Sequence, residues 1–425
     1  MNNQALANLA RATHEFRKPG WLVFGCALIV RLLICFAWRN RALSGNTPEI
    51  LSIVESLLHG RGFVVSTTGE QMSVYGPVYP LFLALIRAAF GTGVWKAQLC
   101  QCVLDSATAA LVWRIGWHLL NNQVGLLAGL LYAIHPIVLN YTTNIIPEPL
   151  FTFCLAWAAL SLLNAKNRNR TIHFVFAGAV LGLATLCRGT TIVFPAFTAV
   201  WLLDSFPWRR ALRMGVIYTI AFAAVVGIWT YRNWKVFGGL IPVTANNNML
   251  WYGSDERICL TDRKGQDWAA AENLREWKAR GLPPPPGHEI AAWEKYYKKL
   301  AFANYHKLLQ ENPWKLVTLY LKKTARVWYA TEDAPAKNLY IALLQFPLLL
   351  LAFLGGRTLW RNKYRAAFWF CTSFVGYFFL LHVIVHPLVR YMEPCLLFLF
   401  ILAVCAFPRL LNVSSSGTDG RQPTQ

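Results

Sequence analysis

The chain has 425 residues, of which 56% are hydrophobic and 14% charged, and its mean hydropathy is +0.36. This composition excludes an ordinary soluble globular protein, and repeated apolar runs of about 17–25 residues indicate a polytopic helical membrane protein. The net charge of +21 does not indicate nucleic-acid binding, because Lys and Arg gather in short loops that set membrane orientation.

The apolar runs predict an all-α bundle of about ten transmembrane helices. The first run, at 20–38, contains Arg31 and is followed by no small-residue cleavage site. We therefore interpret it as a span and not as a cleavable signal. The other expected spans are 95–118, 123–141, 148–165, 171–187, 190–204, 214–231, 338–356, 366–385 and 391–407.

Within the first outer loop, 39–94, two segments are expected to lie at the membrane interface. Segment 77–92 is apolar but short, and a crossing there would invert the charge bias of all later loops. We expect it to be an interfacial or re-entrant helix. Segment 47–59 has an apolar stripe, and Gly60 and Gly62 are expected to end its helix. The stripe consists of Ile50, Ile53, Val54, Leu57 and Leu58.

Basic clusters decide the orientation of the spans. They lie at 166–170, 209–213 and 357–365, and ten spans with a cytoplasmic N-terminus place all three in the cytoplasm, as the positive-inside rule requires. Most acidic residues then fall on the outer side. The chain is expected to divide into a membrane core, an outer-face capping region with surface helices at 266–280 and 289–311, C-terminal membrane helices, and a disordered cytoplasmic tail. These parts are 1–231, 232–337, 338–411 and 412–425.

Glu148 lies between two long apolar segments, at or just inside the membrane boundary. An unpaired charge in hydrocarbon is costly, so such residues usually face a wet cavity. A plainer interpretation is that Glu148 caps the helix that it begins, since an anion suits a helix N-terminus.

Five further polar residues are expected near the same outer boundary, and each has a structural interpretation by itself. Glu49 could be a solvated helix residue, the arginines could extend to the interface, and the histidine could be a satisfied interfacial residue. Their convergence from separate segments instead predicts a pocket for an anionic ligand beside a proton acceptor. The set is Glu49, Arg188, Arg232, His386 and Arg390.

Arg31 and Asp105 lie inside expected spans, and we predict that they form a structural pair, because buried charges are usually paired. The ten cysteines fall mostly inside apolar segments and show no disulfide framework or CxxC metal pattern.

Several stretches, in the right order, resemble the GT-C superfamily of integral membrane glycosyltransferases. The similarity is to the branch of protein O-mannosyltransferases and bacterial lipid A aminoarabinose transferases. Each motif is weak alone, and the ordered set is fairly specific. The motifs are Pro48-Glu49 with Val54 to Phe63 and Gly76 to Leu85, Ile146 to Phe151, Leu186 to Thr190, Trp229 to Gly238, and Arg390 to Pro394.

The resemblance implies an inverting transferase that takes a sugar from a polyprenyl-phosphate donor, with its active site on the outer face. An acidic residue in the first outer loop would activate the acceptor, and basic residues would hold the lipid phosphate. Glu49 and Glu148 are the catalytic candidates. The expected substrate-binding residues are Asn46, Arg188, Arg232, His386 and Arg390.

One departure from the family pattern concerns this base. The family places Asp, or an Asp-Glu pair, where this chain has Asn46 and Thr47, and Asn46 cannot accept a proton. Glu49, one helical turn along, or Glu148 takes the role, or the enzyme is impaired. We favour Glu49.

A divalent cation, Mg or Mn, shared by Glu49 and Glu148 is a further possibility that no spacing demands. No nucleotide-binding pattern occurs, so the chain is not expected to use a nucleotide sugar directly. Expected partners are the lipid-linked donor, a glycan, lipid or protein acceptor, and membrane lipids, but no nucleic acid. The expected location is a bacterial inner membrane. Rival interpretations are a flippase for a lipid-linked sugar and a degenerate family member that binds the carrier without chemistry.

Overall fold

The computed structural model describes residues 18–38, 47–168, 170–287, 289–331 and 335–411. Helices and loops make up this part of the chain, and its β-pairing is an isolated bridge between Val64 and Gln71. The predicted all-α class is therefore confirmed. Asn46, the N-terminal segment before residue 18 and the tail 412–425 lie outside the described residues.

Helices occupy all ten segments that were expected to span the membrane. Within the described residues, five are long and apolar enough to cross by length and composition: α2 (Lys18–Ala37), α8 (Glu148–Arg168), α11 (Trp208–Phe237), α17 (Pro335–Arg361) and α18 (Arg365–Ile384). Two bent pairs also qualify: α4 (Val78–Phe90) with α5 (Val94–Leu119), and α6 (Asn122–Ile134) with α7 (Pro136–Thr142). The chain is an all-α polytopic membrane protein.

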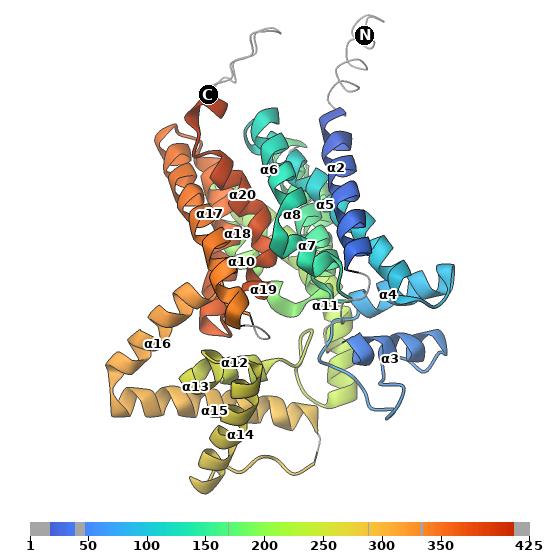
Figure 1. The fold of residues 1–425 in the computed structure, drawn as a ribbon, viewed down its shortest axis with the longest axis vertical. Helices are drawn as coiled ribbons and strands as arrows, with labels where there is room; N and C mark the ends of the chain where they lie inside the picture. Colours follow the sequence, from blue (N-terminus) through green and yellow to red (C-terminus); the bar gives the residue numbers. More distant parts are fainter. Residues whose placement is uncertain (1–17, 39–46, 169, 288, 332–334, 412–425) are drawn as a thin grey trace, which may run out of the picture.

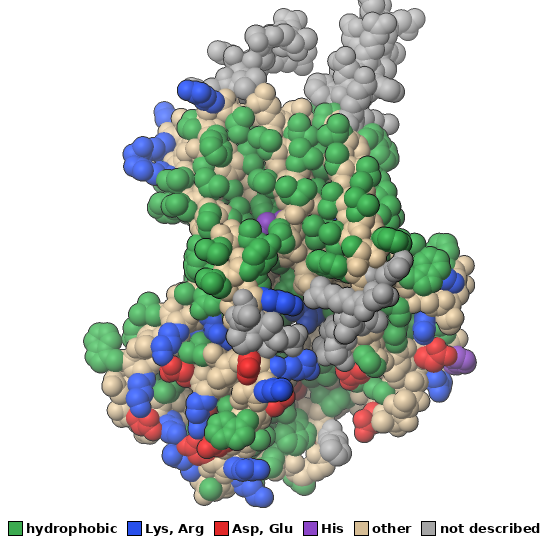
Figure 2. Space-filling view, viewed as in Figure 1, with side chains coloured by type: hydrophobic (Ala, Val, Ile, Leu, Met, Phe, Trp, Pro, Cys, Tyr) green, Lys and Arg blue, Asp and Glu red, His purple; other side chains and the backbone are tan. Residues whose placement is uncertain are grey.

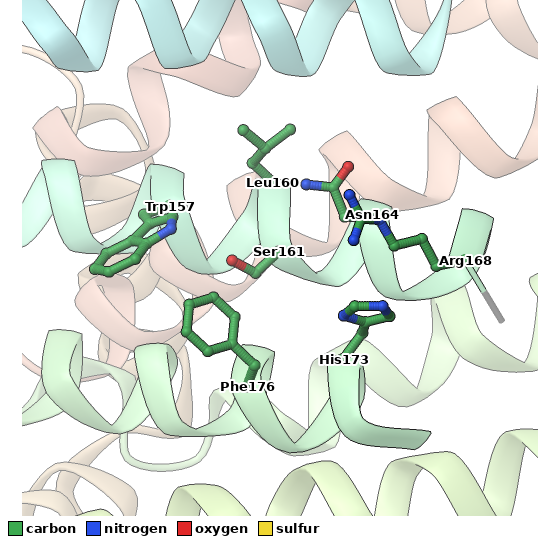
Figure 3. Close-up of a pocket in the computed structure, with 7 residues that line it drawn as sticks. All are labelled: Trp157, Leu160, Ser161, Asn164, Arg168, His173 and Phe176. Atoms are coloured by element: carbon green, nitrogen blue, oxygen red, sulfur yellow. The ribbon is translucent and has the colours of Figure 1, made fainter. Parts of the chain in front are cut away.

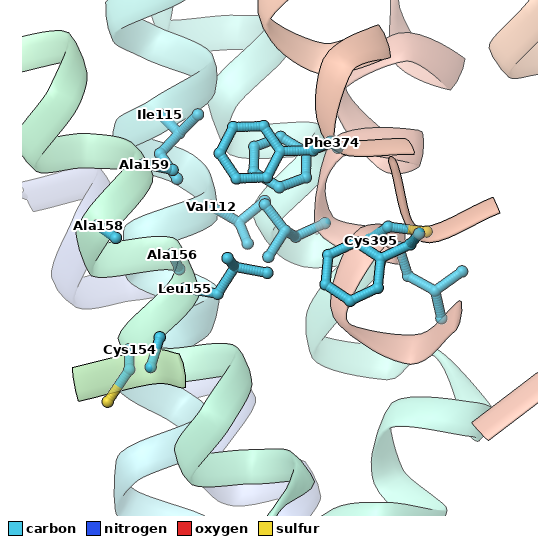
Figure 4. Packing of buried hydrophobic residues seen from close by; sticks show 14 of the residues in the cluster. Val112, Ile115, Cys154, Leu155, Ala156, Ala158, Ala159, Phe374 and Cys395 are labelled. Carbon is cyan, nitrogen blue, oxygen red and sulfur yellow. The ribbon is translucent and has the colours of Figure 1, made fainter. Parts of the chain in front are cut away.

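The remaining expected spans are shorter helices. These are α9 (Thr171–Cys187), α10 (Phe194–Ser205) and α20 (Leu396–Val404), the last preceded by α19 (Val389–Met392) and the 3-10 turn η2 (Glu393–Cys395). A short helix remains stable here because neighbours cover it: every residue of α20 is buried. Figure 4 shows apolar side chains of α5 and α8 meeting Phe374 of α18 and Cys395 in this core.

On the face that Figure 2 shows, apolar side chains cover the bundle, and most of the charged side chains gather beyond one of its ends, the lower one in this view. Large apolar side chains such as Leu33, Ile228 and Phe353 are exposed on α2, α11 and α17, as expected of lipid-facing helices. The beginning of α2 and the end of α20 lie at the other end of the bundle (Figure 1). Both helix ends lie at the same end of the bundle, as they do in a chain that crosses the membrane an even number of times.

The two helices of the first outer loop lie at the charged end of the bundle (Figure 1). Helix α3 (Thr47–Leu58) buries Ile50, Ile53 and Val54, as its stripe predicts. Helix α4 is bent by 115° from α5, so it does not continue that span. The bend falls at Gly91 and Gly93, whose φ angles are 78° and 142°, and glycine adopts such angles at little cost.

Residues 247–326 form five helices beyond the charged end of the bundle (Figure 1), and we call them the cap: α12 (Asn247–Ser254), α13 (Glu256–Cys259), α14 (Arg263–Ala279), α15 (Ile290–Glu311) and α16 (Pro313–Arg326). The first four of them share a small core that includes Trp251, Ile258, Tyr296 and Leu300. The expected surface helices at 266–280 and 289–311 correspond to α14 and α15.

Lys323 joins the cap to the bundle. Its buried ammonium donates to the carbonyls of Gly253 in the cap and of Ile384 at the end of α18, both at 2.9 Å, and to Val385 at 3.3 Å. A Cβ on Gly253 would lie 1.4 Å from the carbonyl oxygen of Val385, so a residue without a side chain is required there.

Arg31 and Asp105 form the predicted structural pair inside the bundle. Arg31 Nε lies 2.7 Å from Asp105 Oδ2, and both side chains are buried. Tyr132 and Thr142 also donate to Asp105, at 2.5 and 2.6 Å. The pair therefore ties α2 and α5 to α6 and α7.

Replacing Asp105 with Ala should destabilise the protein by about 3–5 kcal/mol, because it leaves the Arg31 charge buried without its partner. Thermal unfolding in detergent measures the loss. Asp204→Ala is the matched control, since Asp204 is exposed and its loss should change stability by less than about 0.5 kcal/mol. Equal melting temperatures for the two variants would contradict this structural role.

Candidate functional site

Glu148, the first residue of α8, is completely buried and contacts two arginines. Its Oε1 lies 2.7 Å from a terminal nitrogen of Arg188 and also accepts from Arg390 Nε. Its Oε2 accepts from Arg390 Nη2 at 3.2 Å. Two guanidinium groups around one carboxylate leave an excess positive charge at the charged end of the bundle.

Short breaks in the helices position both arginines. Arg188 is the residue between α9 and the 3-10 turn η1 (Gly189–Thr191), with extended backbone. Arg390 lies in α19, the one-turn helix that precedes η2. The beginning of α8, the end of α9 and the turn that leads into α20 therefore meet at the Glu148 carboxylate.

An aromatic stack lies against Arg188. The guanidinium carbon is 4.9 Å from the centroid of the Tyr391 ring, and the His382 ring stacks on Tyr391 with centroids 4.9 Å apart. Cation–π contact of this kind holds an arginine in one orientation. The stack therefore fixes the direction in which Arg188 presents its charge.

Glu49 forms the second part of the site together with Tyr75. The Tyr75 hydroxyl donates to Glu49 Oε2 at 2.7 Å. Burial raises the pKa of Tyr75 above its usual range, the hydrogen bond and charge of Glu49 raise it further, and Arg390 acts in the opposite direction. The Tyr75 hydroxyl therefore keeps its proton, and Arg390 is near enough to connect the Glu49 and Glu148 parts electrostatically.

Gly76 brings the first outer loop against the end of α9. A Cβ at this position would lie 2.1 Å from the carbonyl oxygen of Leu186. Only glycine permits this approach, and it sets Tyr75 beside the segment that carries Arg188.

Arg232 contacts the first outer loop and not the Glu148 group. It donates to Gln71 Oε1 at 2.6 Å and to the carbonyl of Met72 at 3.2 Å, and it lies 4.8 Å from the Trp229 ring. These contacts hold the loop against α11, so Arg232 positions the segment that follows α3.

His386 lies buried where the cap meets the bundle. Its ring faces Tyr252 of α12 and Tyr391, and its Nε2 is 3.4 Å from the Gln266 amide of α14. Burial, together with the charges of Lys323 and Arg326, lowers the pKa of His386 to about 3. The histidine is therefore neutral at physiological pH while the cap is docked.

The divalent cation expected at Glu49 and Glu148 stays a prediction, and both carboxylates already have protein partners. Both oxygens of Glu148 accept from arginines, and Glu49 accepts from Tyr75. Across the described ranges, no group of three or more His, Cys, Asp or Glu side chains could hold a metal ion. We therefore derive no step through a metal.

Sequence reasoning missed Tyr75, His382 and Tyr391. Tyr391 lies inside the quoted motif Arg390 to Pro394, and Tyr75 directly precedes the motif that begins at Gly76; these positions were the available signal. Tyrosine at a membrane boundary is common, which hides the ones that line a site.

Comparison with known proteins shows what this chain is similar to. The family described as dolichyl-phosphate-mannose-protein mannosyltransferase matches residues 74–234, which include Tyr75, Glu148, Arg188 and Arg232. The oligosaccharyltransferase AglB of Archaeoglobus fulgidus, solved with an inhibitory peptide and a dolichol-phosphate, superposes with a TM-score of 0.54 at 14% identity. The chain shares the fold of the matched part of AglB.

The match extends over only part of AglB. The match to AglB covers 91% of this chain and 50% of that one, so this chain spans about half the length of AglB. The apo form of the same enzyme gives a TM-score of 0.56 with the same identity and coverage.

ArnT of Cupriavidus metallidurans, bound to undecaprenyl phosphate, is 13% identical over 91% of this chain and 77% of that one. Its TM-score is 0.42, which is lower than the value of 0.54 for AglB. The search of curated proteins found no match.

The buried state of His386 predicts a pH dependence of cap docking. When the cap detaches, His386 regains its ordinary pKa of about 6.5, so between pH 6.5 and about 3 the detached state binds a proton that the docked state does not. Docking should therefore weaken as the pH falls below 6.5. Hydrogen exchange of α12 and α14 at pH 7 and pH 5 measures this.

A variant isolates the contribution of His386. His386→Asn cannot titrate in this range, so it should remove part of the pH dependence of exchange in α12 and α14. His306→Asn is the control, because His306 lies on α15 with an exposed side chain. An unchanged slope in His386→Asn would contradict the assignment.

Proposed function

We propose that the chain is a membrane glycosyltransferase that moves a sugar from a polyprenyl-phosphate donor to an acceptor, with inversion. The observation that carries the proposal is the excess positive charge of Arg188 and Arg390 around Glu148, beside the Glu49–Tyr75 pair. This reaction needs a cationic group that holds an anion and an acidic group that accepts a proton, and the site has both side by side.

The arginines would bind the donor phosphate. Their guanidinium groups suit charge-assisted contacts with phosphate oxygens, and they stabilise the negative charge that grows as the sugar–phosphate bond breaks. Glu148 positions both groups for this task, since its carboxylate holds them against mutual repulsion. The dolichol-phosphate bound to AglB supports a lipid-phosphate donor.

Glu49 would act as the base. It takes the proton of an acceptor hydroxyl, whose oxygen attacks the anomeric carbon from the face opposite the phosphate. The new sugar–oxygen bond forms as the old one breaks, and polyprenyl phosphate leaves with the bonding electrons. Glu148 is the less suitable base because both of its oxygens accept from arginines. Tyr75 directs one oxygen of Glu49 and leaves the other for the acceptor.

The orientation follows from charge. Helix α8 runs from Glu148 to Arg168, so the basic cluster at 166–170 lies at the far end of the bundle from the site. With basic loops in the cytoplasm, the site lies on the outer face of the inner membrane, where a glycan, lipid or protein acceptor is met.

Transfer in proteoliposomes with mixed bacterial polyprenyl-phosphate sugars tests the function. Wild type should release polyprenyl phosphate when acceptor is present, and Glu49→Gln should slow turnover by about 10²–10⁴-fold, the usual contribution of general base catalysis, while retaining donor. Glu148→Gln should instead weaken donor binding. Glu55→Gln is the matched control, since Glu55 lies on the same helix but pairs with Arg87.

Other outcomes identify the rival functions. Full activity in Glu49→Gln would make the base assignment wrong. Donor movement between leaflets without consumption would indicate a flippase, and donor binding without turnover over a broad acceptor panel would indicate a carrier-binding protein that lost catalysis through Asn46.

The ring of Tyr391 predicts a separate effect on donor affinity. Tyr391→Leu removes the surface on which Arg188 rests and should raise the donor KM about tenfold, which corresponds to about 1.4 kcal/mol, with a smaller change in kcat. Tyr391→Phe keeps the ring and should restore most of the affinity. Equal KM values for the two variants would rule out this positioning role.

A further inference from the structure

A hollow of about 210 Å³ lies between α8 and α9, at the end of α8 away from Glu148. Its walls come from both helices (Figure 3), and they include Trp157, Leu160, Asn164, Arg168, His173 and Phe176. It has no part in the site at Glu148, since its nearest lining residue on α8, Trp157, is more than two helical turns from Glu148.

The two ends of the hollow differ in chemistry. Asn164, Arg168 and His173 lie together at one end, and Trp157 and Phe176 lie at the other (Figure 3). The rings of Trp157 and Phe176 meet edge to face with centroids 5.7 Å apart. The hollow therefore offers hydrogen-bond donors and a positive charge next to an aromatic wall.

The depth of this hollow in the membrane agrees with the chemistry of its polar and aromatic ends. Helix α8 has 21 residues and is therefore about 30 Å long, the thickness of the hydrocarbon core. Glu148 and Arg168 then lie at opposite boundaries, and Trp157 lies about 16 Å from Arg168 along the helix, toward the bilayer centre. The polar end faces headgroups, and the aromatic end faces acyl chains.

Charge selects the kind of headgroup. The lining residues carry no carboxylate, and Arg170, at the beginning of α9, adds positive charge near the polar end. Lys166 of the same cluster serves elsewhere: its ammonium lies 5.6 Å from the Trp201 ring of α10, near Asp204. Arg168 is thus the cation that the hollow itself presents, and it complements an anion.

We propose that this hollow binds an anionic glycerophospholipid from the leaflet opposite the Glu148 site. The phosphate contacts the Arg168 guanidinium and the His173 ring, and one acyl chain lies along Trp157 and Phe176. The contact would anchor the inner ends of α8 and α9, the two helices whose other ends carry Glu148 and Arg188. This inference is independent of the glycosyltransferase proposal.

Native mass spectrometry of the full chain in detergent tests the site. The probes are phosphatidylglycerol and phosphatidylcholine with identical acyl chains. Phosphatidylglycerol should bind about tenfold more tightly to wild type, a difference of about 1.4 kcal/mol. The double variant Arg168→Gln with His173→Gln should lose that preference, and Trp157→Ala should bind both lipids more weakly.

Arg170→Gln is the matched control, because it removes a neighbouring positive charge that does not line the hollow. It should keep the preference for phosphatidylglycerol. The proposal fails if Arg170→Gln loses as much preference as the double variant, since the cluster would then attract anionic lipid without a site. It fails also if the double variant, with an unchanged melting temperature, keeps the preference, or if equimolar polyprenyl phosphate displaces phosphatidylglycerol.

Discussion

The pairing of a buried carboxylate with two guanidinium groups is the constraint on which the charged end of the bundle depends. Glu148 is far from Arg188 and Arg390 in sequence, yet its oxygens contact both. A buried charge without a partner is strongly destabilising, so the beginning of α8, the end of α9 and the turn into α19 must stay together. Gly76 then lets the first outer loop pack closely against the end of α9.

Most of the fold could be predicted because a bilayer requires long apolar helices. The bends were harder to predict. Helix α6 ends at Ile134, and the next residue, His135, is extended before Pro136, as residues before proline usually are, but hydropathy alone reads 123–141 as one span. Helix α20 is short because η2 precedes it, and burial by neighbours replaces length. The packing of the cap depends on contacts distant in sequence.

The site was harder to predict from the sequence than the fold was. Glu148, Arg188 and Arg390 were expected near one boundary, and the structure brings them into contact. Arg232 and His386 were grouped with them because a boundary position does not reveal direction: Arg232 contacts the loop that contains Gln71, and His386 faces the cap. Tyr391 could not be singled out, because its importance comes from the arginine that rests on it.

The docking of the cap through Lys323 has a consequence for how such proteins can diversify. Its three acceptors are main-chain carbonyls, which every amino acid supplies. The side chains around the joint can therefore change without loss of the anchor, provided that Gly253 is kept. A different cap that presents a lysine and a glycine in the same register could be exchanged onto the same bundle, so the cap can evolve independently of the bundle beneath it.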